Sequence, residues 1–140
     1  MNANYFLDTN IFVYIHDQQS PEKQNISKDL LYTGLCTGTV CISSQVISEY
    51  FVTANNKLQL PYSEIVQIIH QLGRLPVVEI TYAMTVRSST RTKAYSISYW
   101  DALIVEAARC GGCSVLYTED LQHGQIIDEI TVKNPYQTEI

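Results

Sequence analysis

Two acidic residues follow apolar runs that have the length of buried strands. Asp8 comes directly after the run 5–7, and Asp120 comes three residues after the run 115–117. Short continuous apolar runs are typical of strands covered on both faces of a parallel sheet. In an open parallel sheet, ligands bind outside the carboxyl ends of the strands. The sequence therefore predicts that both carboxylates lie at a ligand-binding edge of the sheet.

Two further acids stand out by their helical phase. Glu49 borders the apolar stripe of a predicted helix, one residue before Tyr50 and three after Val46. Asp101 lies within the apolar stripe of another helix and in its first turn, where the helix dipole favours an anion. Its neighbours on that face are Ile97, Ile104, Val105 and Ala108. Burying a carboxylate costs free energy unless a group of opposite charge or a hydrogen-bond donor pairs with it. We therefore expect each of these two acids to have such a partner.

The chemistry that suits these acids is metal binding. Four carboxylates from Asp8, Glu49, Asp101 and Asp120 would form an oxygen-only cage of the kind that suits Mg²⁺ or Mn²⁺. A divalent ion relieves the repulsion between them, activates a bound water and neutralises charge on a phosphodiester. Taken singly, Asp101 could be a helix-terminal charge and Asp8 a helix cap. Taken together, the four predict metal-dependent phosphodiester hydrolysis.

The elements that must position these acids alternate along the chain. Apolar runs alternate with helical patterns, as in βαβ units with helices on both faces of a parallel sheet. No repeat or linker interrupts the pattern, so residues 1–140 are expected to form one α/β domain with a mostly parallel sheet of four to five strands. Strands are predicted at 5–7, 40–42, within 75–80, at 115–117 and at 130–132. Helices are predicted at 10–17, from 21 to the 34–38 region, from 43 or 44 to 55, and at 61–73, 81–92 and 98–111.

Composition supports a folded domain with a local site. The 140 residues are 46% hydrophobic and 16% charged, which excludes intrinsic disorder, and the formal charge is −5. An acidic chain does not hold nucleic acid by bulk electrostatics, so any such role must be local. No window approaches the ~18 apolar residues that cross a bilayer. The first seven residues carry no basic residue of a signal peptide. We therefore expect a cytoplasmic protein with no membrane partner.

Four segments resemble, in order and spacing, the signature segments of PIN-domain nucleases. They are Leu7-Asp8-Thr9-Asn10-Ile11, Ser43-Ser44-Gln45-Val46-Ile47-Ser48-Glu49, Ile97-Ser98-Tyr99-Trp100-Asp101-Ala102-Leu103-Ile104 and Leu116-Tyr117-Thr118-Glu119-Asp120-Leu121-Gln122-His123-Gly124. Asn134-Pro135-Tyr136 is similar to the end of that domain, so the resemblance spans essentially the whole chain. It implies a three-layer α/β/α sandwich and a single-strand-directed endoribonuclease that depends on Mg²⁺ or Mn²⁺.

The resemblance also implies roles for individual residues. The catalytic and metal-binding quartet would be Asp8, Glu49, Asp101 and Asp120. The supporting residues would be Thr9 and Thr118 through their hydroxyls, Asn10 by orienting the first acid, and Glu119 as a fifth carboxylate. In length the chain is similar to the toxin of a VapBC-type, type II toxin–antitoxin pair. This implies an RNA substrate, a small antitoxin that blocks the acidic groove, and a homodimer.

Basic residues near an aromatic side chain suggest where RNA could bind. Arg87, Arg91 and Lys93 lie within seven positions and are followed by Tyr95. On a helix the two arginines share a face and could hold phosphates while Tyr95 stacks on a base. A solvated helix face is an equally good interpretation. His123 could reach a phosphate or a bound water, although a structural hydrogen bond in its loop is the favoured interpretation.

Two cysteines have the spacing of a redox or zinc motif. Cys110 and Cys113 flank two glycines, and Cys36 with Cys41 could complete a four-cysteine site. The motif falls at a helix end rather than at the helix start that lowers a thiol pKa, and the glycines suit a helix stop. We therefore expect neither zinc nor a disulfide.

Two other functions fit parts of the pattern. An inactive PIN fold could serve as an RNA- or protein-binding module, and it would bind no Mn²⁺ at neutral pH in a calorimetric titration. A phosphatase with Asp8 as nucleophile would resemble the haloacid-dehalogenase group, which carries a second Asp two residues on. Here that position is Asn10, which argues against the phosphatase.

Overall fold

Six short strands form one sheet in the computed structural model of the chain, which describes residues 5–137. The sheet order is β3-β2-β1-β4-β6-β5, and every neighbouring pair is parallel except β5 and β6. The strands are β1 (Tyr5–Leu7), β2 (Val40–Ser43), β3 (Val77–Val78), β4 (Val115–Tyr117), β5 (Ile126–Ile127) and β6 (Ile130–Lys133). The predicted mostly parallel sheet is confirmed, and β5 is a strand that the sequence did not predict.

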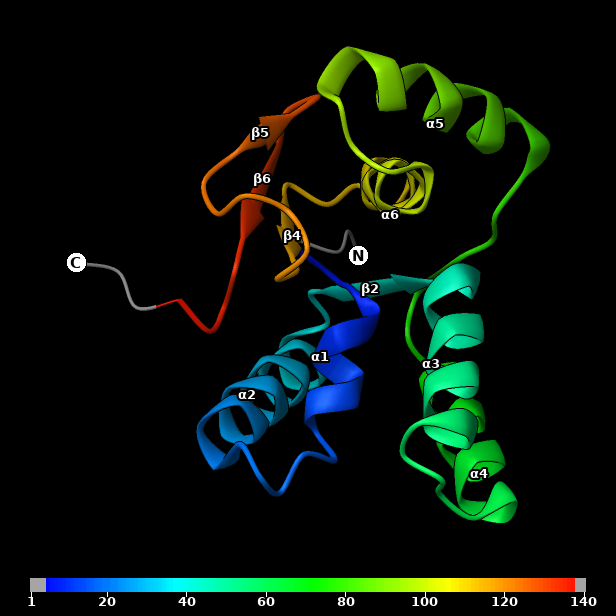
Figure 1. The fold of residues 1–140 in the computed structure, drawn as a ribbon, viewed down its shortest axis with the longest axis vertical. Coiled ribbons are helices and arrows are strands. Elements are labelled where there is room, and N and C mark those ends of the chain that lie inside the picture. Colours follow the sequence, from blue (N-terminus) through cyan, green and yellow to red (C-terminus); the bar gives the residue numbers. More distant parts are fainter. Residues whose placement is uncertain (1–4, 138–140) are drawn as a thin grey trace.

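Helices cover both faces of this sheet. Figure 1 shows α5 and α6 on one side of the strands and α1 to α4 on the other. The helices are α1 (Thr9–Tyr14), α2 (Pro21–Thr37), α3 (Ser44–Asn56), α4 (Tyr62–Leu72), α5 (Tyr82–Tyr95) and α6 (Tyr99–Cys110). The three-layer α/β/α sandwich expected from the resemblance is confirmed.

The strand order reverses direction between β1 and β4, which makes this position the topological switch point of the sheet. From β1 the chain moves outward through β2 to β3 and then returns to place β4 on the other side of β1. Leu7 pairs with Tyr117, so the two strands end side by side, and the Asp8 amide extends the ladder by donating to the Tyr117 carbonyl at 3.1 Å. Ligands bind at such a reversal in open parallel sheets. The two strand-end acids therefore lie where the fold provides a crevice.

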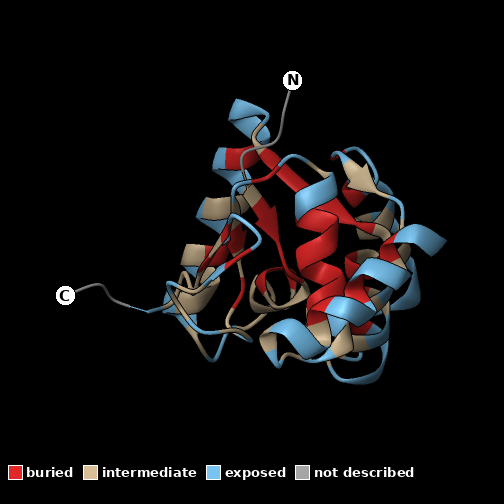
Figure 2. Cartoon of the chain, turned by 90° about the horizontal axis from the view of Figure 1, so that it is seen from above, coloured by how far each residue is buried: buried red, intermediate tan, exposed pale blue. Residues whose placement is uncertain are grey.

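Serine caps fix the start of the two helices that carry the other acids. The Ser43 hydroxyl accepts from the Val46 amide at α3, and the Ser98 hydroxyl accepts from the Asp101 amide at α6. Such caps satisfy backbone N–H groups that have no partner within the helix. The middle of α6 is fully surrounded, and Figure 2 shows it as a red helix at the centre of the domain. Both acids are thus held on firmly anchored helices.

Some predicted boundaries differ from the observed ones. The first helix was predicted over 10–17, but α1 ends at Tyr14 because the His16 and Asp17 amides bond back only three residues, to Val13 and Tyr14. The helix predicted over 81–92 is capped by Thr81, begins at Tyr82 and continues three residues farther than predicted, to Tyr95.

The described range bears in part on the predictions for the whole chain. Within it, no helix combines the length and apolar character needed to span a membrane. The predicted single domain over 1–140 includes residues 1–4 and 138–140, which lie outside the described residues. The prediction about the first seven residues likewise includes 1–4.

Candidate active site

Three carboxylates that are distant in sequence meet above the switch point. Asp8 follows β1, Asp101 lies in the first turn of α6, and Asp120 lies in the loop after β4. One oxygen from each lies within 4.8 Å of the others. Asp8 is buried, Asp101 is half-buried and Asp120 is exposed. The site is therefore closed at the bottom, where Asp8 lies, and open to solvent at Asp120.

Hydrogen bonds from neighbouring residues fix two members of this acidic triad. The Thr118 hydroxyl donates to Oδ2 of Asp8 at 2.7 Å and accepts from the Asp120 amide at 3.1 Å. The Thr9 amide donates to Oδ1 of Asp8 at 2.6 Å. Thr118 therefore links the two acids, and its supporting role at a metal site stays a prediction.

Asn10 supports a different acid from the one expected. Its side-chain amide donates to Oδ2 of Asp120 at 3.2 Å and to the Thr118 hydroxyl at 3.5 Å. The sequence resemblance assigned it to the first acid, Asp8. The difference arises because Asn10 belongs to the first turn of α1, which turns its side chain toward the loop after β4. Its carboxamide oxygen is buried and has no hydrogen-bond partner in the described residues.

Glu49 borders the triad but lies outside the group of three oxygens within 4.8 Å. Its Oε1 accepts from the Thr9 hydroxyl at 2.5 Å, and its Oε2 accepts from the Gln45 side chain at 3.1 Å. Its negative charge nevertheless contributes to the raised pKa of the acids in the triad. Three of the four predicted acids are thus brought together, with the fourth held beside them by Thr9.

Burial and mutual repulsion make the triad costly to ionise. Burial raises the pKa of Asp8 to about 7, against hydrogen bonds from Thr118 and Thr9 that lower it, and the charges of Asp120 and Glu49 add to the rise. Burial is also the main cause of the raised pKa of Asp101 and of Asp120. A cation at this point would remove the penalty.

The donors fit a hard divalent ion. They are all carboxylate oxygens, they converge from three elements, and burial raises the pKa of each acid, with the charges of neighbouring carboxylates adding to the rise. Oxygen-only sites of this kind suit Mg²⁺ and Mn²⁺ rather than softer metals. Asp8, Asp101 and Asp120 are therefore the residues that could hold the metal.

An open groove of about 1080 Å³ runs beside the triad between α1 and α3. At the end near the triad it is lined by Thr9, Asn10, Glu49 and Glu119, and farther along by residues that include Tyr14, His16 and Lys57. The groove therefore leads past Glu49 and Glu119 to the open side of the triad.

Comparison with known sequences places this geometry in a family. The sequence model of the PIN domain matches residues 5–127. The chain belongs to the PIN domain family. A search of curated proteins gave no significant match.

Solved structures share the fold of this PIN domain. Mycobacterium tuberculosis VapC20, described as a sarcin-ricin loop cleaving toxin, is 17% identical, with a TM-score of 0.67 over 84% of this chain and 90% of its own. A toxin–antitoxin complex from Klebsiella pneumoniae gives 19% identity and a TM-score of 0.70 over 96% and 100%. VapBC2 from Rickettsia felis, solved with a promoter DNA fragment, gives 24% and 0.63 over 92% and 96%. At these identities the similarity establishes the fold.

The fifth carboxylate, Glu119, faces the groove rather than the triad. Its Oε1 accepts from the Tyr14 hydroxyl at 2.6 Å, and its Oε2 lies 3.4 Å from the Lys23 ammonium. Its charge contributes to the raised pKa of Asp120. Glu119 therefore acts on the triad through its charge, and its direct contacts are with α1 and α2.

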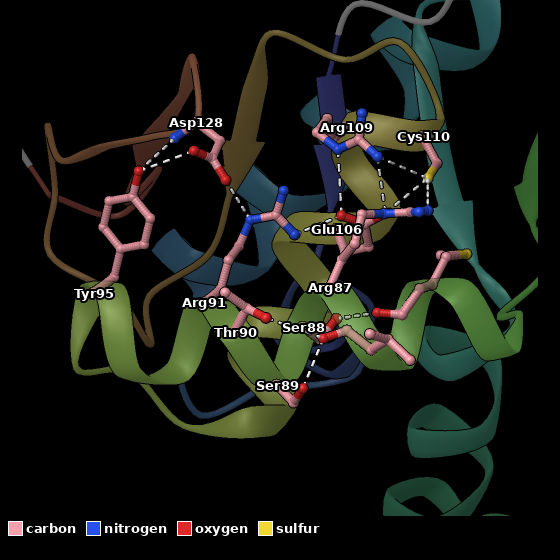
Figure 3. Close-up of polar contacts among 12 residues, drawn as sticks. Arg87, Ser88, Ser89, Thr90, Arg91, Tyr95, Glu106, Arg109, Cys110 and Asp128 are labelled. Carbon is pink, nitrogen blue, oxygen red and sulfur yellow. Dashed lines mark hydrogen bonds and ion pairs between the residues drawn. The ribbon is translucent and has the colours of Figure 1, made fainter.

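The arginines predicted to bind RNA are occupied within the PIN domain itself (Figure 3). Arg91 is 7% exposed, and it donates through Nη1 to Glu106 and through Nε to Asp128, each at 2.5 Å. Arg87 donates through Nε to Glu106 at 2.6 Å. A buried arginine with carboxylates on two of its nitrogens is not available to a phosphate at the surface. The shared face predicted for these residues is correct, but it packs on α6.

The predicted RNA surface also included Tyr95 and Lys93, of which Tyr95 is hydrogen-bonded within the protein and Lys93 is exposed. The Tyr95 hydroxyl donates to Oδ1 of Asp128 at 3.0 Å and accepts from its amide at 3.3 Å. This places Tyr95 in the ion-pair network of Figure 3 rather than at a free stacking surface. Lys93 is exposed, and its predicted RNA contact remains a prediction.

Glu106 is the structural acid that sequence reasoning missed. It is fully buried in α6 and accepts from Arg87, Arg91 and Arg109. Burial raises the pKa of Glu106, but the hydrogen bonds from the arginines outweigh this and lower it to about 2. The available signal was a charged residue inside the apolar run 102–108, with basic residues on the preceding helix.

His123 and the cysteines have structural surroundings. Nδ1 of His123 accepts from the Asn134 amide at 3.0 Å, which agrees with the favoured interpretation as a loop hydrogen bond. Cys36 and Cys110 are exposed, Cys41 and Cys113 are buried, and all four are unpaired thiols. The glycine pair after α6 ends the helix as predicted, with Gly112 in the left-handed region at φ +74°.

Proposed function

We propose that this PIN domain is an endoribonuclease that depends on Mg²⁺ or Mn²⁺ and hydrolyses RNA phosphodiester bonds. The observation that carries the proposal is the triad of Asp8, Asp101 and Asp120, whose oxygens approach within 4.8 Å at the switch point of the sheet. Membership of the PIN domain family supports it. In this proposal an extended single strand lies in the groove beside the triad, which is lined at that end by Thr9, Asn10 and Glu49.

In this proposal the triad holds the metal ion, and Glu49 adds a fourth negative charge beside it. When bound, the ion supplies an activated water and neutralises charge on the scissile phosphate and the leaving oxygen. Thr118 and Thr9 fix both oxygens of Asp8, so that this acid keeps one orientation during the reaction. Asn10 fixes Asp120 at the open side of the site, where the substrate arrives.

The cellular role that we infer is that of a toxin in a type II toxin–antitoxin pair. Several structures of the same fold are VapBC or other toxin–antitoxin complexes. A small antitoxin that occupies the acidic groove would block access to the triad. The cytoplasmic location and the homodimer remain predictions.

A cleavage assay tests the ribonuclease directly. Purified protein is incubated with single-stranded and structured RNAs in Mg²⁺, in Mn²⁺ or in EDTA. We expect cleavage by the wild type only when metal is present, and cleavage by Asp8→Asn no faster than in EDTA. Asp29→Asn, which removes an exposed acid from α2, is the matched control and should cleave like the wild type. Equal cleavage by the wild type and Asp8→Asn would refute the proposal.

The toxin role has its own test. The protein is expressed conditionally in a host, with and without the protein encoded next to it, and growth is scored. Arrest by the wild type, relief by the neighbouring protein and no arrest by Asp8→Asn are the expected results. Normal growth with the active wild-type enzyme would refute the toxin role while leaving the ribonuclease proposal to the cleavage assay.

A further inference from the structure

One cation lies against the acidic edge of the groove. Among the described lysines and arginines, Lys23 is the one that pairs with an acid of this site, with its Nζ 3.4 Å from Oε2 of Glu119. Lys23 belongs to the first turns of α2, whereas Glu119 immediately precedes Asp120 of the triad. The positive charge is therefore attached to the loop that carries a proposed metal ligand.

An aromatic cluster holds this ammonium in place. Nζ of Lys23 donates to the Tyr14 hydroxyl at 3.1 Å and lies 4.6 Å from the centre of the Tyr14 ring and 5.3 Å from that of Tyr136. The two rings meet edge to face at 4.9 Å, and the Tyr136 hydroxyl shares a 2.7 Å hydrogen bond with Ser27 of the same helix. Cation–π contact and the hydroxyl acceptor both favour a fixed ammonium position.

The ammonium remains able to bind a further anion. An ammonium group has three N–H donors, and the contacts with Tyr14 and Glu119 account for two of them. The Lys23 and Glu119 side chains are 38% and 26% exposed, so their ion pair is partly screened by water. A phosphate arriving in the groove can thus contact Lys23 without displacing it from the Tyr14 ring.

The position of Lys23 matches the need of an acidic site for a counter-charge to the substrate. Both of its hydrogen-bond partners, Tyr14 and Glu119, line the groove that passes the triad. An RNA strand in the groove would bring phosphates past five carboxylates, which repel them. One fixed ammonium at the edge gives a phosphate next to the cleaved bond a favourable contact.

We propose that Lys23, fixed on Tyr14 and paired with Glu119 in the free protein, binds a backbone phosphate of single-stranded RNA and positions the strand over the triad. The inference rests on the proposed ribonuclease function. It assigns Lys23 as a positioning residue, whose contribution is to bind and align the strand. Glu119 then serves to hold the ammonium at the groove until RNA arrives.

RNA binding as a function of salt is the readout that a purely structural lysine would not change. The binding of a labelled single-stranded RNA is followed by fluorescence anisotropy over a series of KCl concentrations, in the Asp8→Asn background so that the RNA stays intact. Adding Lys23→Gln should weaken binding about threefold to tenfold and reduce the slope of log K against log salt by about 0.7, the value for one phosphate of a single strand. Lys23→Arg should restore most of the affinity, since it keeps the charge.

The matched control is Lys28→Gln, which removes the same charge from an exposed position of the same helix. It should leave both the affinity and the slope unchanged within twofold. In the active background, Lys23→Gln should raise KM for RNA with kcat within about twofold of the wild type. The thermal midpoint of Lys23→Gln should fall by no more than about 5 °C, through the lost contacts with Tyr14 and Glu119, while that of Lys28→Gln should stay at the wild-type value.

The outcomes separate this inference from the proposed function. Cleavage by the wild type together with equal RNA binding by Lys23→Gln and Lys28→Gln overturns the role of Lys23 and leaves the ribonuclease intact. An equal reduction of the salt slope in Lys23→Gln and Lys28→Gln also overturns it, because the effect then comes from the net charge of the protein. Absence of RNA cleavage by the wild type overturns the proposed function and, with it, the phosphate contact.

Discussion

Replacing Asp8 with asparagine should stabilise the metal-free protein at pH 8 while it abolishes activity. Asp8 is only 4% exposed and its pKa is raised to about 7, mainly by burial. The folded protein therefore tolerates the neutral acid and resists the carboxylate. Asparagine keeps the shape of the side chain and can still accept the hydroxyl hydrogen bond from Thr118.

The size of the effect follows from proton linkage. The ordinary pKa of the side chain is 3.8 and the folded value is about 7, and each pKa unit corresponds to about 1.4 kcal/mol. Because the folded state binds the proton more tightly than the unfolded state, stability falls as the pH rises through this window. Ionising Asp8 costs about 4 kcal/mol at pH 8 but less than half of that at pH 5, so the wild type loses about 3 kcal/mol between them.

The experiment compares the free energy of unfolding of Asp8→Asn with that of the wild type. The predicted quantity is the change in this difference between pH 5 and pH 8. Urea unfolding in EDTA at pH 5 and pH 8 gives the free energy of unfolding of the wild type and of Asp8→Asn. The variant loses the bond from the Thr9 amide to Oδ1, which costs about 1–3 kcal/mol at both pH values. Relative to the wild type, it should therefore gain about 3 kcal/mol on going from pH 5 to pH 8.

Asp29→Asn is the control for this experiment, because Asp29 is exposed on α2. Its difference from the wild type should stay constant between the two pH values. Addition of Mn²⁺ at pH 8 should stabilise the wild type by mass action and leave Asp8→Asn unchanged. A difference between wild type and Asp8→Asn that is the same at pH 5 and pH 8 would refute the argument that burial controls the ionisation of Asp8.

Three other substitutions probe the supporting structure. Thr118→Val removes the hydroxyl that bridges Asp8 and Asp120 and should lower Mn²⁺ affinity in calorimetry about 10- to 100-fold, with urea unfolding to verify the fold. Glu106→Gln should destabilise the protein by about 3 kcal/mol or more in urea at pH 7. This deficit should shrink as the pH falls from 4.5 toward the folded pKa of about 2, because protonation of Glu106 in the unfolded state then destabilises the wild type as well. Gly34→Ala should cost about 1–3 kcal/mol in thermal unfolding, because a Cβ there would lie 2.6 Å from that of Val40. Wild-type Mn²⁺ affinity of Thr118→Val, or wild-type stability of Glu106→Gln or of Gly34→Ala, would contradict the corresponding contact.

The site could be predicted as far as local signals determine it. Asp8 and Asp120 were found because each follows a short apolar strand, and a parallel sheet brings such ends together. Asp101 was found because its helical phase and its Ser98 cap are both visible in the sequence. The position of Glu49 just outside the triad depends on how α3 packs against α1, which no local pattern specifies.

The ion-pair network shows the limit of the same reasoning. Helical spacing correctly placed Arg87 and Arg91 on one face of α5, but the direction of that face depends on tertiary packing. It points at the buried carboxylate of Glu106 in α6, which pairs with both arginines and holds Arg91 away from the solvent. The sequence therefore grouped the charges correctly, but it predicted an RNA-binding or solvated face where the structure has internal ion pairs.

Strand β5 was missed because its turn lacks the usual sequence signal. The turn to β6 contains Asp128 and Glu129 at φ 46° and 71°, a region in which glycine or asparagine is the common choice. The Asp128 side chain is held there by Arg91 and Tyr95. Long-range contacts thus stabilise a hairpin turn that local propensity does not favour.

The central claim is that Asp8, Asp101 and Asp120 form one divalent-metal site. Isothermal titration of the protein with Mn²⁺ at pH 7.5 tests it most directly, with Asp120→Asn as the variant and Asp29→Asn as the control. We expect saturable binding by the wild type and the control, and no detectable binding by Asp120→Asn, which removes a carboxylate of the triad. Failure of the wild type to bind Mn²⁺, or equal binding by Asp120→Asn, would contradict the claim.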